Sequence, residues 1–581
     1  MAPRAGGSGN LPGQTLGVAL TSGLVRRGRR EWLTSAPGRA LQTSPGPVQG
    51  LVISPPGLRP ADPEAGARIL GGSWVLAGAA MQTGPGGDPW DRPSPHRRFA
   101  EVLHQFTWLP DLLTQGAAGR SEGLRLYLEW RRLFGHWNAF AWDPQVLERR
   151  LFHLACGARA ICERGSEAET LMVARDLVRQ GRFLLASIEG PERAAEAAAV
   201  AALAGAVTLG DGGVRLRERA LARLAQALPV SVEPDGGHAS RSPEAALELL
   251  FDLRTLDEAL ALRGLPAPDE LGRAIDRLTG AIWFLTLADG ALPAFQGGDE
   301  SRREYVAAAD AGVADETGAV PARPASRNGY HRLESARLQV LVDAAAPASG
   351  AFSRTACGQP LALEVLVDGI RLITNCGWSP AAAGPQALRL IDAGSCASLA
   401  EQTCGDVLEG AAAALLGPRL VDGSGTVRVD RREAEEGIWL EVSHDGWASR
   451  YGLRHSRRIY VDRLRHELRG EDAFVPVGPP PADPARARRF ISLSVCFHAH
   501  PHARASLAMD RRSVLLRPDQ AQSGWWLRND ASEVTLEPSV HYVGGLPRRA
   551  QRIMLRSQIR LDEGGRMRWK LARAEPGGGS V

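Results

Sequence analysis

A histidine and an arginine lie three residues apart in a glycine-rich loop, Gly236-Gly237-His238-Ala239-Ser240-Arg241. Histidine transfers protons near neutral pH, and a guanidinium can bind a carboxylate with two parallel hydrogen bonds. Pro243 follows, a residue favoured at the first position of a helix, so the loop precedes a helix and can face a groove. His238 and Arg241 are therefore our candidate catalytic residues. The alternative for His238 is capping or packing of that helix.

A second set of polar and aromatic side chains is compact in sequence: His136, Trp137, Asn138 and Trp142. Aromatic rings and an amide are suited to stacking on sugars and hydrogen bonding to them. We take His136, Asn138 and Trp142 as candidates for substrate binding. The alternative is a tryptophan-rich helix end that packs into the core.

Three histidines alternate in the segment that contains His498, His500 and His502. On a strand they would share one face, where histidines can bind metal, but Pro501 favours an end to the strand there. Structural packing or exposure is the preferred interpretation, and the His444-Asp445-Gly446 string is interpreted as a tight turn. The seven cysteines form no CxxC pair and no zinc spacing, which favours reduced thiols in a reducing compartment.

Helical periodicity dominates from residue 96 to 300, where we expect about eight helices of 12 to 20 residues. Leu271, Leu278 and Ile282 illustrate an apolar stripe at helical spacing. Ser166-Glu167-Ala168-Glu169 is a capping box, and the helix after Pro243 should stop near Gly264. Ala197 to Leu209 is too short for a membrane span and predicts a buried helix.

Near residue 300 the pattern changes to strands, with a linker over 301–327 and a β-domain over 328–574. Asp368-Gly369 predicts a two-residue hairpin turn. The expected strands are Arg337 to Val342, Leu361 to Val367, Ile370 to Thr374, Thr426 to Val429, Ile491 to Cys496, Ser513 to Leu516 and Val534 to Leu536.

The ends of the chain differ from its middle. Residues 1–50 are rich in Gly, Pro, Ser and Arg, and we expect a disordered basic leader with no recognisable signal peptide. Residues 51–95 suggest a short hairpin that leads into the first helix, and 575–581 a flexible glycine-rich tail.

Composition narrows the function classes. The 581 residues include 69 basic and 65 acidic side chains, so the net charge of +4 argues against a nucleic-acid-binding protein. All basic residues except Lys570 are arginines, a skew typical of a GC-rich genome. An isolated arginine, or a pair such as Arg457-Arg458, therefore carries little functional weight and is interpreted as solvated. The sequence contains no candidate transmembrane segment.

Several strings together resemble the heparinase II/III family over roughly residues 55 to 575. The resemblance implies an α+β multidomain architecture, an (α/α) toroid of antiparallel helical hairpins followed by an antiparallel β-sandwich. The strings are Gly236 to Pro243, Asp289-Gly290-Ala291-Leu292-Pro293, Gly329-Tyr330-His331-Arg332-Leu333, Leu361-Ala362-Leu363-Glu364, Asn375-Cys376-Gly377, Ser443 to Trp447 and Phe497-His498-Ala499-His500-Pro501.

The family chemistry implied is β-elimination on acidic polysaccharides that contain uronate. This reaction needs a group that neutralises the C5 carboxylate, a base for the C5 proton and an acid for the leaving O4. His238 falls where the family carries a polar residue facing substrate, and Asn375 is a further candidate for substrate binding. No cofactor is implied.

The sequence departs from catalytic relatives at several places. Their Ala-His before the LSFE-like strand is here Ala356-Cys357, their DxG aspartate is Asn375, and their second Ala-His is Ala393-Gly394. We therefore predict no metal site; thiolate ligation by Cys357, Cys376 and Cys396 is the alternative. Relatives also show Tyr-His after the proline, where this chain has Glu-Ala-Ala-Leu.

Two functions follow from these observations. The first is a polysaccharide lyase whose partner is an acidic polysaccharide or oligosaccharide in the cell envelope or periplasm. The second is a glycan-binding or envelope polysaccharide-assembly protein that keeps the scaffold without the catalytic groups, with a cytoplasmic location as the alternative.

Overall fold

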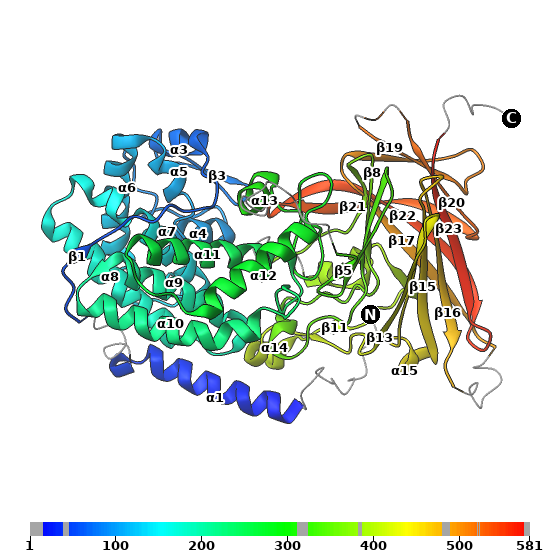
Figure 1. Cartoon of the computed structure of the whole chain (residues 1–581), viewed down its shortest axis with the longest axis horizontal. Helices are drawn as coiled ribbons and strands as arrows, with labels where there is room; N and C mark the ends of the chain where they lie inside the picture. Colours follow the sequence, from blue (N-terminus) through cyan, green and yellow to red (C-terminus); the bar gives the residue numbers. More distant parts are fainter. Residues whose placement is uncertain are drawn as a thin grey trace. The chain divides into compact units, whose positions relative to one another are not determined.

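The computed structural model describes residues 16–38, 46–310, 324–380, 386–478, 488–519, 521 and 523–574. The chain forms two compact units. The β unit contains Met1–Gly23, Asp235–Ala246 and Gly280–Val581, and the helical unit contains Leu24–Pro234 and Leu247–Thr279. The helices of the helical unit run from blue to green in Figure 1, and the sheets of the β unit from green to red.

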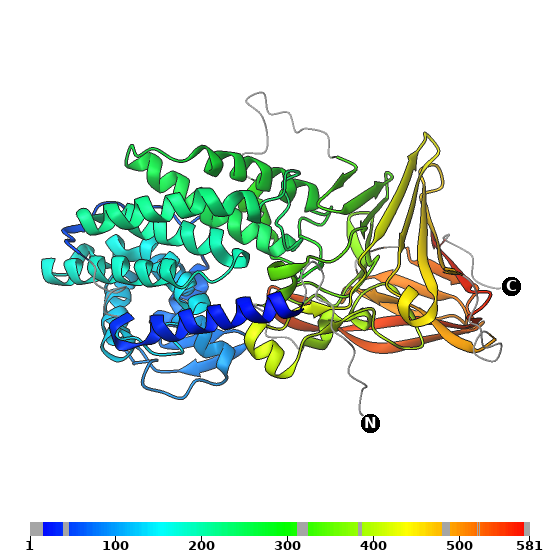
Figure 2. The same ribbon diagram turned by 90° about the horizontal axis from the view of Figure 1, so that it is seen from below.

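Long helices make up the helical unit, and they lie roughly side by side in Figure 2. Seven helices of 14 to 21 residues occupy Gly116 to Leu285, close to the eight expected: α6 (Gly116–Phe134), α7 (Pro144–Ile161), α8 (Glu167–Ala186), α9 (Ala194–Val207), α10 (Asp211–Ser231), α11 (Pro243–Leu262) and α12 (Asp269–Leu285). The shorter α3 (Pro63–Leu70), α4 (Arg97–His104) and α5 (Leu109–Leu113) precede them.

The local signals in these helices are confirmed. Ser166 and Glu169 form the capping box of α8, and α11 begins at Pro243 and ends just before Gly264. Every residue of the alanine-rich α9 is buried, and α9 packs against α7, α8 and α10. Small side chains let neighbouring helices approach α9 on all sides, which is why this short apolar run belongs to the core.

The lead-in hairpin is also present, formed by β2 (Ser73–Leu76) and β3 (Ala79–Gln82). Its turn residues Ala77 and Gly78 both have positive φ, as a two-residue hairpin of this kind requires. A further two-stranded pairing joins β1 (Gly50–Leu51) to β4 (Thr208–Leu209). None of the described helices is long and apolar enough to cross a membrane.

The expectation of disorder over residues 1–50 is wrong for α1, which covers Leu16–Thr34. The residues between Pro12 and Pro37 include no proline, and leucine, alanine and arginine are good helix formers. Residues 1–15 and 39–45 lie outside the described part of the chain, as does the tail 575–581.

The β unit contains two antiparallel sheets, as expected. One sheet has nine strands in the order β21-β22-β17-β9-β8-β7-β6-β5, with β10 paired to β17; the other has eight in the order β13-β14-β15-β16-β23-β20-β19-β18. Phe497 of the first sheet packs against Trp569 of the second, with ring centroids 4.9 Å apart. The apolar core of the sandwich therefore lies between the sheets.

All seven predicted strands are present, and Asp368-Gly369 joins two of them as a hairpin turn with positive φ at both residues. These strands are β7 (Leu338–Asp343), β8 (Leu363–Val367), β9 (Ile370–Thr374), β13 (Val427–Glu433), β17 (Phe490–Ala499), β19 (Val514–Pro518) and β21 (Glu533–Val543).

Other strands complete the two sheets. They are β5 (Ser326–Arg327), β6 (Tyr330–Glu334), β10 (Ala397–Leu399), β14 (Gly437–His444), β15 (Leu453–Asp462), β16 (Glu467–Pro476), β18 (Ala503–Leu507), β20 (Trp525–Asn529), β22 (Leu546–Arg560) and β23 (Gly565–Arg573). Short additions are the pair β11 (Asp406–Val407) and β12 (Leu420–Val421), and the helices α14 (Gly410–Leu416) and α15 (Ala448–Tyr451).

The domain boundary predicted at residue 300 is too late, because residues from Gly280 onward belong to the β unit. Arg371 of β9 pairs with Asp289 at 3.0 Å, and the backbone N–H of Ala294 donates to Glu364 at 2.9 Å. These bonds fix the segment after α12 to the first sheet. The expected linker 301–327 begins with helix α13 (Arg303–Asp310), and residues 311–323 lie outside the described part.

Candidate functional site

The loop that carries His238 is buried within the β unit. Only 2% of His238 is exposed, its Nδ1 lies 2.7 Å from the Ser240 hydroxyl, and the Ser240 backbone N–H donates to the same nitrogen at 3.2 Å. Phe352 packs edge-on against the imidazole ring. Because Nδ1 accepts the backbone N–H, its ring proton is on Nε2. The loop therefore fixes both the orientation and the tautomer of His238.

The guanidinium of Arg241 forms its bonds with other groups of the β unit. It pairs with Asp343 at 2.5 Å and donates to the backbone carbonyls of Asn328, Ala345 and Ala346. Four of its five N–H donors are therefore engaged. The guanidinium also lies over the Tyr330 ring, 4.9 Å from its centroid. This arrangement gives Arg241 a structural role and leaves little capacity to bind the carboxylate of a ligand.

The loop at His238 is hydrogen-bonded to the Asn328-Gly329-Tyr330 segment. The Tyr330 hydroxyl donates to the Arg241 carbonyl at 2.8 Å, and the Asn328 amide donates to the His238 carbonyl at 3.2 Å. Arg241 has φ of 62°, a conformation that these bonds hold in place. The two strings thus form one hydrogen-bonded joint between the loop and the first sheet.

Asn375 is fully buried at the end of β9. Its side-chain oxygen accepts the Ser395 N–H at 2.8 Å, and its amide group lies 3.4 Å from Glu364. The asparagine thus holds the 393–396 loop in place with hydrogen bonds. Its side chain thus has bonding partners within the β unit.

The three cysteines proposed as alternative thiolate ligands are poorly suited to that role. Burial raises the pKa of Cys357 and of Cys376 to about 11 each, and it also raises the pKa of Cys396. The Cys357 N–H donates to Gln296, and the Cys396 thiol contacts the Ile391 carbonyl at 3.2 Å. In the described residues these cysteines are not part of any group of side chains spaced to hold a metal.

The candidates in the helical unit form the turn between α6 and α7. Asn138 accepts the Ala141 N–H at 2.7 Å, and the indole N–H of Trp142 donates to the Phe134 carbonyl. Trp142 is buried edge-on against Phe183, whereas His136 is exposed. Asn138 and Trp142 thus stabilise a tryptophan-rich helix connection, the alternative that the sequence left open.

Sequence reasoning missed a buried cluster in the β unit, formed by Glu300, His500 and His541. One Glu300 oxygen accepts from His500 at 2.9 Å, and His541 Nε2 and the Arg371 guanidinium lie 3.0 and 3.3 Å from the same oxygen. Although burial opposes ionisation, these neighbours hold the pKa of Glu300 well below its usual range. The Phe497-to-Pro501 string was the available signal for this cluster.

The cluster does not fit a metal ion. His500 accepts the His502 N–H at Nδ1, so its proton is on the Nε2 that faces Glu300. His541 donates from its other nitrogen to the Asn375 carbonyl at 2.7 Å. A cation would have to displace the Nε2 proton of His500 and lie beside the guanidinium of Arg371. The three residues therefore form a buried hydrogen-bonded ion cluster.

A second buried network crosses the sandwich and corrects the expectation that Arg457 is solvated. Arg457 is fully buried, pairs with Asp472 at 2.7 Å, and donates to the carbonyls of Leu361 and Ser395. His455 also donates to Asp472, at 2.8 Å. Because Leu361 and Ser395 belong to segments beside the first sheet, Arg457 of β15 ties the two sheets together.

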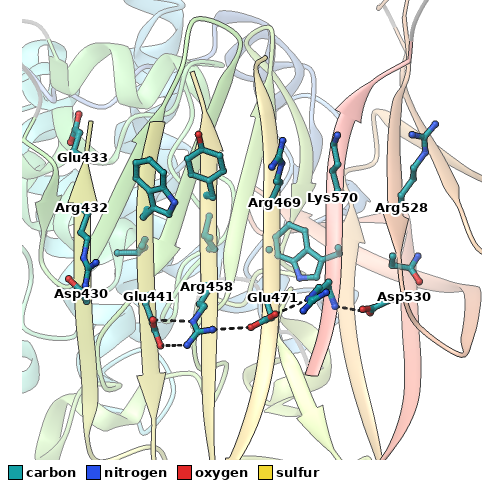
Figure 3. A pocket seen from close by; sticks show the side chains of 18 of the residues that line it. Asp430, Arg432, Glu433, Glu441, Arg458, Arg469, Glu471, Arg528, Asp530 and Lys570 are labelled. Carbon is teal, nitrogen blue, oxygen red and sulfur yellow. Dashed lines mark hydrogen bonds and ion pairs between the residues drawn. The ribbon is translucent and has the colours of Figure 1, made fainter. Parts of the chain in front are cut away.

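An open hollow of about 950 Å³ lies on the solvent side of the eight-stranded sheet. Figure 3 shows its floor, with side chains from β13, β14, β15, β16, β23 and β20. Sequence reasoning did not find it because its lining is rich in arginine, which was treated as compositional background. Half-exposed Trp439, Tyr460 and the single lysine, Lys570, are uncommon residues that could have marked it.

Comparisons with known proteins agree with this architecture. Residues 318–570 match the family model described as heparinase II/III-like, C-terminal. FtsZ-localized protein C of Caulobacter vibrioides (strain NA1000 / CB15N) is 46% identical over 565 residues, 97% of each chain. A crystal structure of heparinase III matches with a TM-score of 0.65 at 12% identity, covering 94% of this chain and 91% of that one. A mutant of the heparan sulfate lyase HepC from Pedobacter heparinus matches with a TM-score of 0.57 at 13% identity, covering 96% and 90%.

Proposed function

The chain belongs to the heparinase II/III-like family, and from this premise we propose that it works as a binding protein associated with FtsZ and not as an active lyase. The support for the partner is the relative named for localisation with FtsZ, which aligns over 97% of both chains. An alignment of that extent covers both units.

One observation carries the non-catalytic part of the proposal: the predicted catalytic residues His238 and Arg241, and the predicted substrate-binding residue Asn375, have hydrogen-bond partners inside the protein. His238 is held by Ser240, Arg241 is held by Asp343 and three carbonyls, and Asn375 is held by Ser395. A base, or a group that neutralises a carboxylate, needs free donor or acceptor positions in a groove. These three residues have structural partners where a lyase would need ligand partners.

The thiols support the cytoplasmic alternative for localisation over the cell envelope. All seven cysteines are free, and six of them are buried. Free thiols persist in a reducing compartment, whereas oxidising compartments favour disulfides. We therefore propose that the chain acts on the reducing side of the membrane. Localisation of a fluorescent fusion during depletion of FtsZ tests both the proposed partner, FtsZ, and the proposed cytoplasmic location.

The second candidate function is a lyase that cleaves acidic glycans by β-elimination. Its support is the fold, which matches heparinase III over more than nine tenths of each chain. In that case an acidic glycan would be the partner, and His238 would leave its bonds to Ser240 and take the C5 proton. The C4–O4 bond would then break to leave a C4–C5 double bond, and the departing O4 would take a proton from water.

An absorbance assay separates the two functions. The purified chain is incubated with heparan sulfate, hyaluronate and other uronate-containing glycans, and the ultraviolet absorbance of the unsaturated uronate is followed. We expect no increase above a buffer control, with heparinase III as the positive control. An increase that disappears in His238→Ala would reverse the assignment in favour of the lyase.

A further inference from the structure

The floor of the hollow on the eight-stranded sheet is organised in two rows that run across the strands. Cross-strand pairing places six residues of the first row, called here the aromatic-cation row, directly opposite one another. In strand order they are Arg432, Trp439, Tyr460, Arg469, Lys570 and Arg528. At a strand spacing of about 4.8 Å the row is about 24 Å long, the length of about seven residues of extended chain.

The second row, called here the mixed-charge row, lies two residues away along each strand. The dashed lines in Figure 3 mark its bonds: the guanidinium of Arg458 pairs with Glu441 and Glu471, and that of Arg568 pairs with Glu471. The backbone N–H of Arg568 donates to Asp530 at 2.8 Å. The row is Asp430, Glu441, Arg458, Glu471, Arg568 and Asp530. Four carboxylates and two guanidinium groups make this side of the hollow net acidic.

Cations exceed their partners at the other side of the hollow. Lys570 and Arg469 share Glu467, at 2.8 and 3.2 Å, and Asp462 lies 3.8 Å from Arg469. Arg528, opposite Lys570 in the register, has no carboxylate partner among the described residues. Three cations, those of Arg469, Lys570 and Arg528, thus face two carboxylates, and among the described residues the charge of Arg528 has no carboxylate to neutralise it.

The aromatic pair in the first row is built into the sheet. Trp439 and Tyr460 stack with ring centroids 4.5 Å apart, and 38% of Trp439 remains exposed. Gly437 makes room for the tyrosine, because a Cβ at that position would lie 2.3 Å from the ring of Tyr460. A half-exposed tryptophan held by its neighbours is the kind of side chain that dominates binding energy at interfaces.

We propose that this hollow binds an extended acidic peptide segment of a partner protein, with an apolar or aromatic residue on the Trp439–Tyr460 pair. Successive side chains of an extended peptide point to opposite sides. Acidic side chains can then face Lys570 and Arg528, while neutral or basic ones face the mixed-charge row. A polyanionic glycan carries one sign of charge throughout and would place part of it against the four carboxylates of that row.

The inference rests on the proposed function in taking the partner to be a protein. Its test uses the full chain and a dye-labelled ten-residue peptide of alternating Glu and Ser with one central Phe. Fluorescence anisotropy measures binding, with the same peptide carrying Lys in place of Glu as the charge control. A heparan sulfate oligosaccharide of similar length forms the glycan arm.

Two double variants make the test specific. Lys570→Gln with Arg528→Gln removes the two cations that we propose face the acidic side chains of the peptide, and we expect the acidic peptide to bind about tenfold more weakly. Arg504→Gln with Arg517→Gln removes two exposed cations that face each other on β18 and β19 of the same sheet, outside the hollow. This control should leave affinity within about twofold. Trp439→Ala should also cost about tenfold.

Three outcomes would overturn the proposal. They are equal weakening by both double variants, no preference for the acidic over the basic peptide, and binding of the glycan without binding of the peptide. FtsZ is absent from this assay, so the two proposals fail separately. If the chain associates with FtsZ but does not bind the peptide, only the proposed binding site in the hollow is contradicted. If it binds the peptide but does not associate with FtsZ, only the proposed partner is contradicted.

Discussion

Replacing Asp472 with alanine is expected to destabilise the β unit by about 3–5 kcal/mol, because it leaves Arg457 buried without its counter-charge. Asp472 is fully buried and accepts from Arg457 at 2.7 Å, His455 at 2.8 Å and the Trp569 indole at 3.0 Å. Although burial opposes ionisation, these donors lower the pKa of Asp472. Chemical denaturation followed by circular dichroism measures the change.

The control for this variant is Asp430→Ala, which removes an exposed ion pair with Arg432 on the same sheet. Its cost should stay below about 1 kcal/mol. A double variant, Arg457→Met with Asp472→Leu, should recover much of the lost stability because it removes the buried charge altogether. A loss below about 1 kcal/mol in Asp472→Ala would show that Arg457 does not depend on this carboxylate.

Acidification between about pH 6.5 and 4 is expected to destabilise the protein steeply, because many of its histidines are buried without charge. Burial lowers the pKa of His498 to about 3, and burial lowers that of His500 to about 4 despite its bond to Glu300. The pKa is lowered in seven histidines in all: His104, His153, His331, His444, His455, His498 and His500.

The sign follows from proton binding. A histidine in the unfolded chain binds its proton near pH 6.5, whereas these seven histidines bind theirs in the folded protein only at lower pH. As the pH falls from 6.5 to the folded pKa, each of them therefore lowers the free energy of unfolding by about 1.4 kcal/mol per pH unit. Asp299 offsets the effect of one histidine. Burial raises the pKa of Asp299 to about 6, so the folded state binds a proton there at a higher pH than the unfolded state does. The carboxylates with lowered pKa, such as Glu300, lose their contribution only at still lower pH.

Thermal unfolding between pH 7.5 and 4.5 measures this dependence. We expect the midpoint temperature to fall sharply below pH 6.5 and acid unfolding to have a midpoint of about pH 5. His498→Gln should make the pH dependence shallower, whereas His502→Gln, at an exposed position, should not. A midpoint temperature that is constant from pH 7.5 to 5 would contradict this account of the buried histidines.

Local signals predicted the elements whose sequences are least ambiguous. The capping box of α8, the Pro243 start of α11 and the Asp368-Gly369 turn each follow from the chemistry of a few adjacent residues. Strands β15, β16 and β23 were missed because arginine, glutamate and lysine occupy their solvent-facing positions and dilute the apolar alternation. The helix α1 was missed because composition outweighed local propensity.

The site was less predictable than the fold. Arg241, Arg457 and Arg528 look alike in a sequence dominated by arginine, yet one joins a loop to a sheet, one ties two sheets together and one is exposed in a hollow. Their roles depend on residues about 15 to more than 100 positions away, such as Asp343 and Ser395. Because isolated arginines were given little functional weight, the arginines that line the hollow were not predicted as binding residues.

The most direct test of the proposed function is the localisation of a fluorescent fusion of the full chain in its native host while FtsZ is depleted. Our account predicts that the fusion gathers with FtsZ, disperses as FtsZ is lost, and behaves in the same way when it carries His238→Ala. A fusion whose position does not change on depletion of FtsZ would contradict the proposed association.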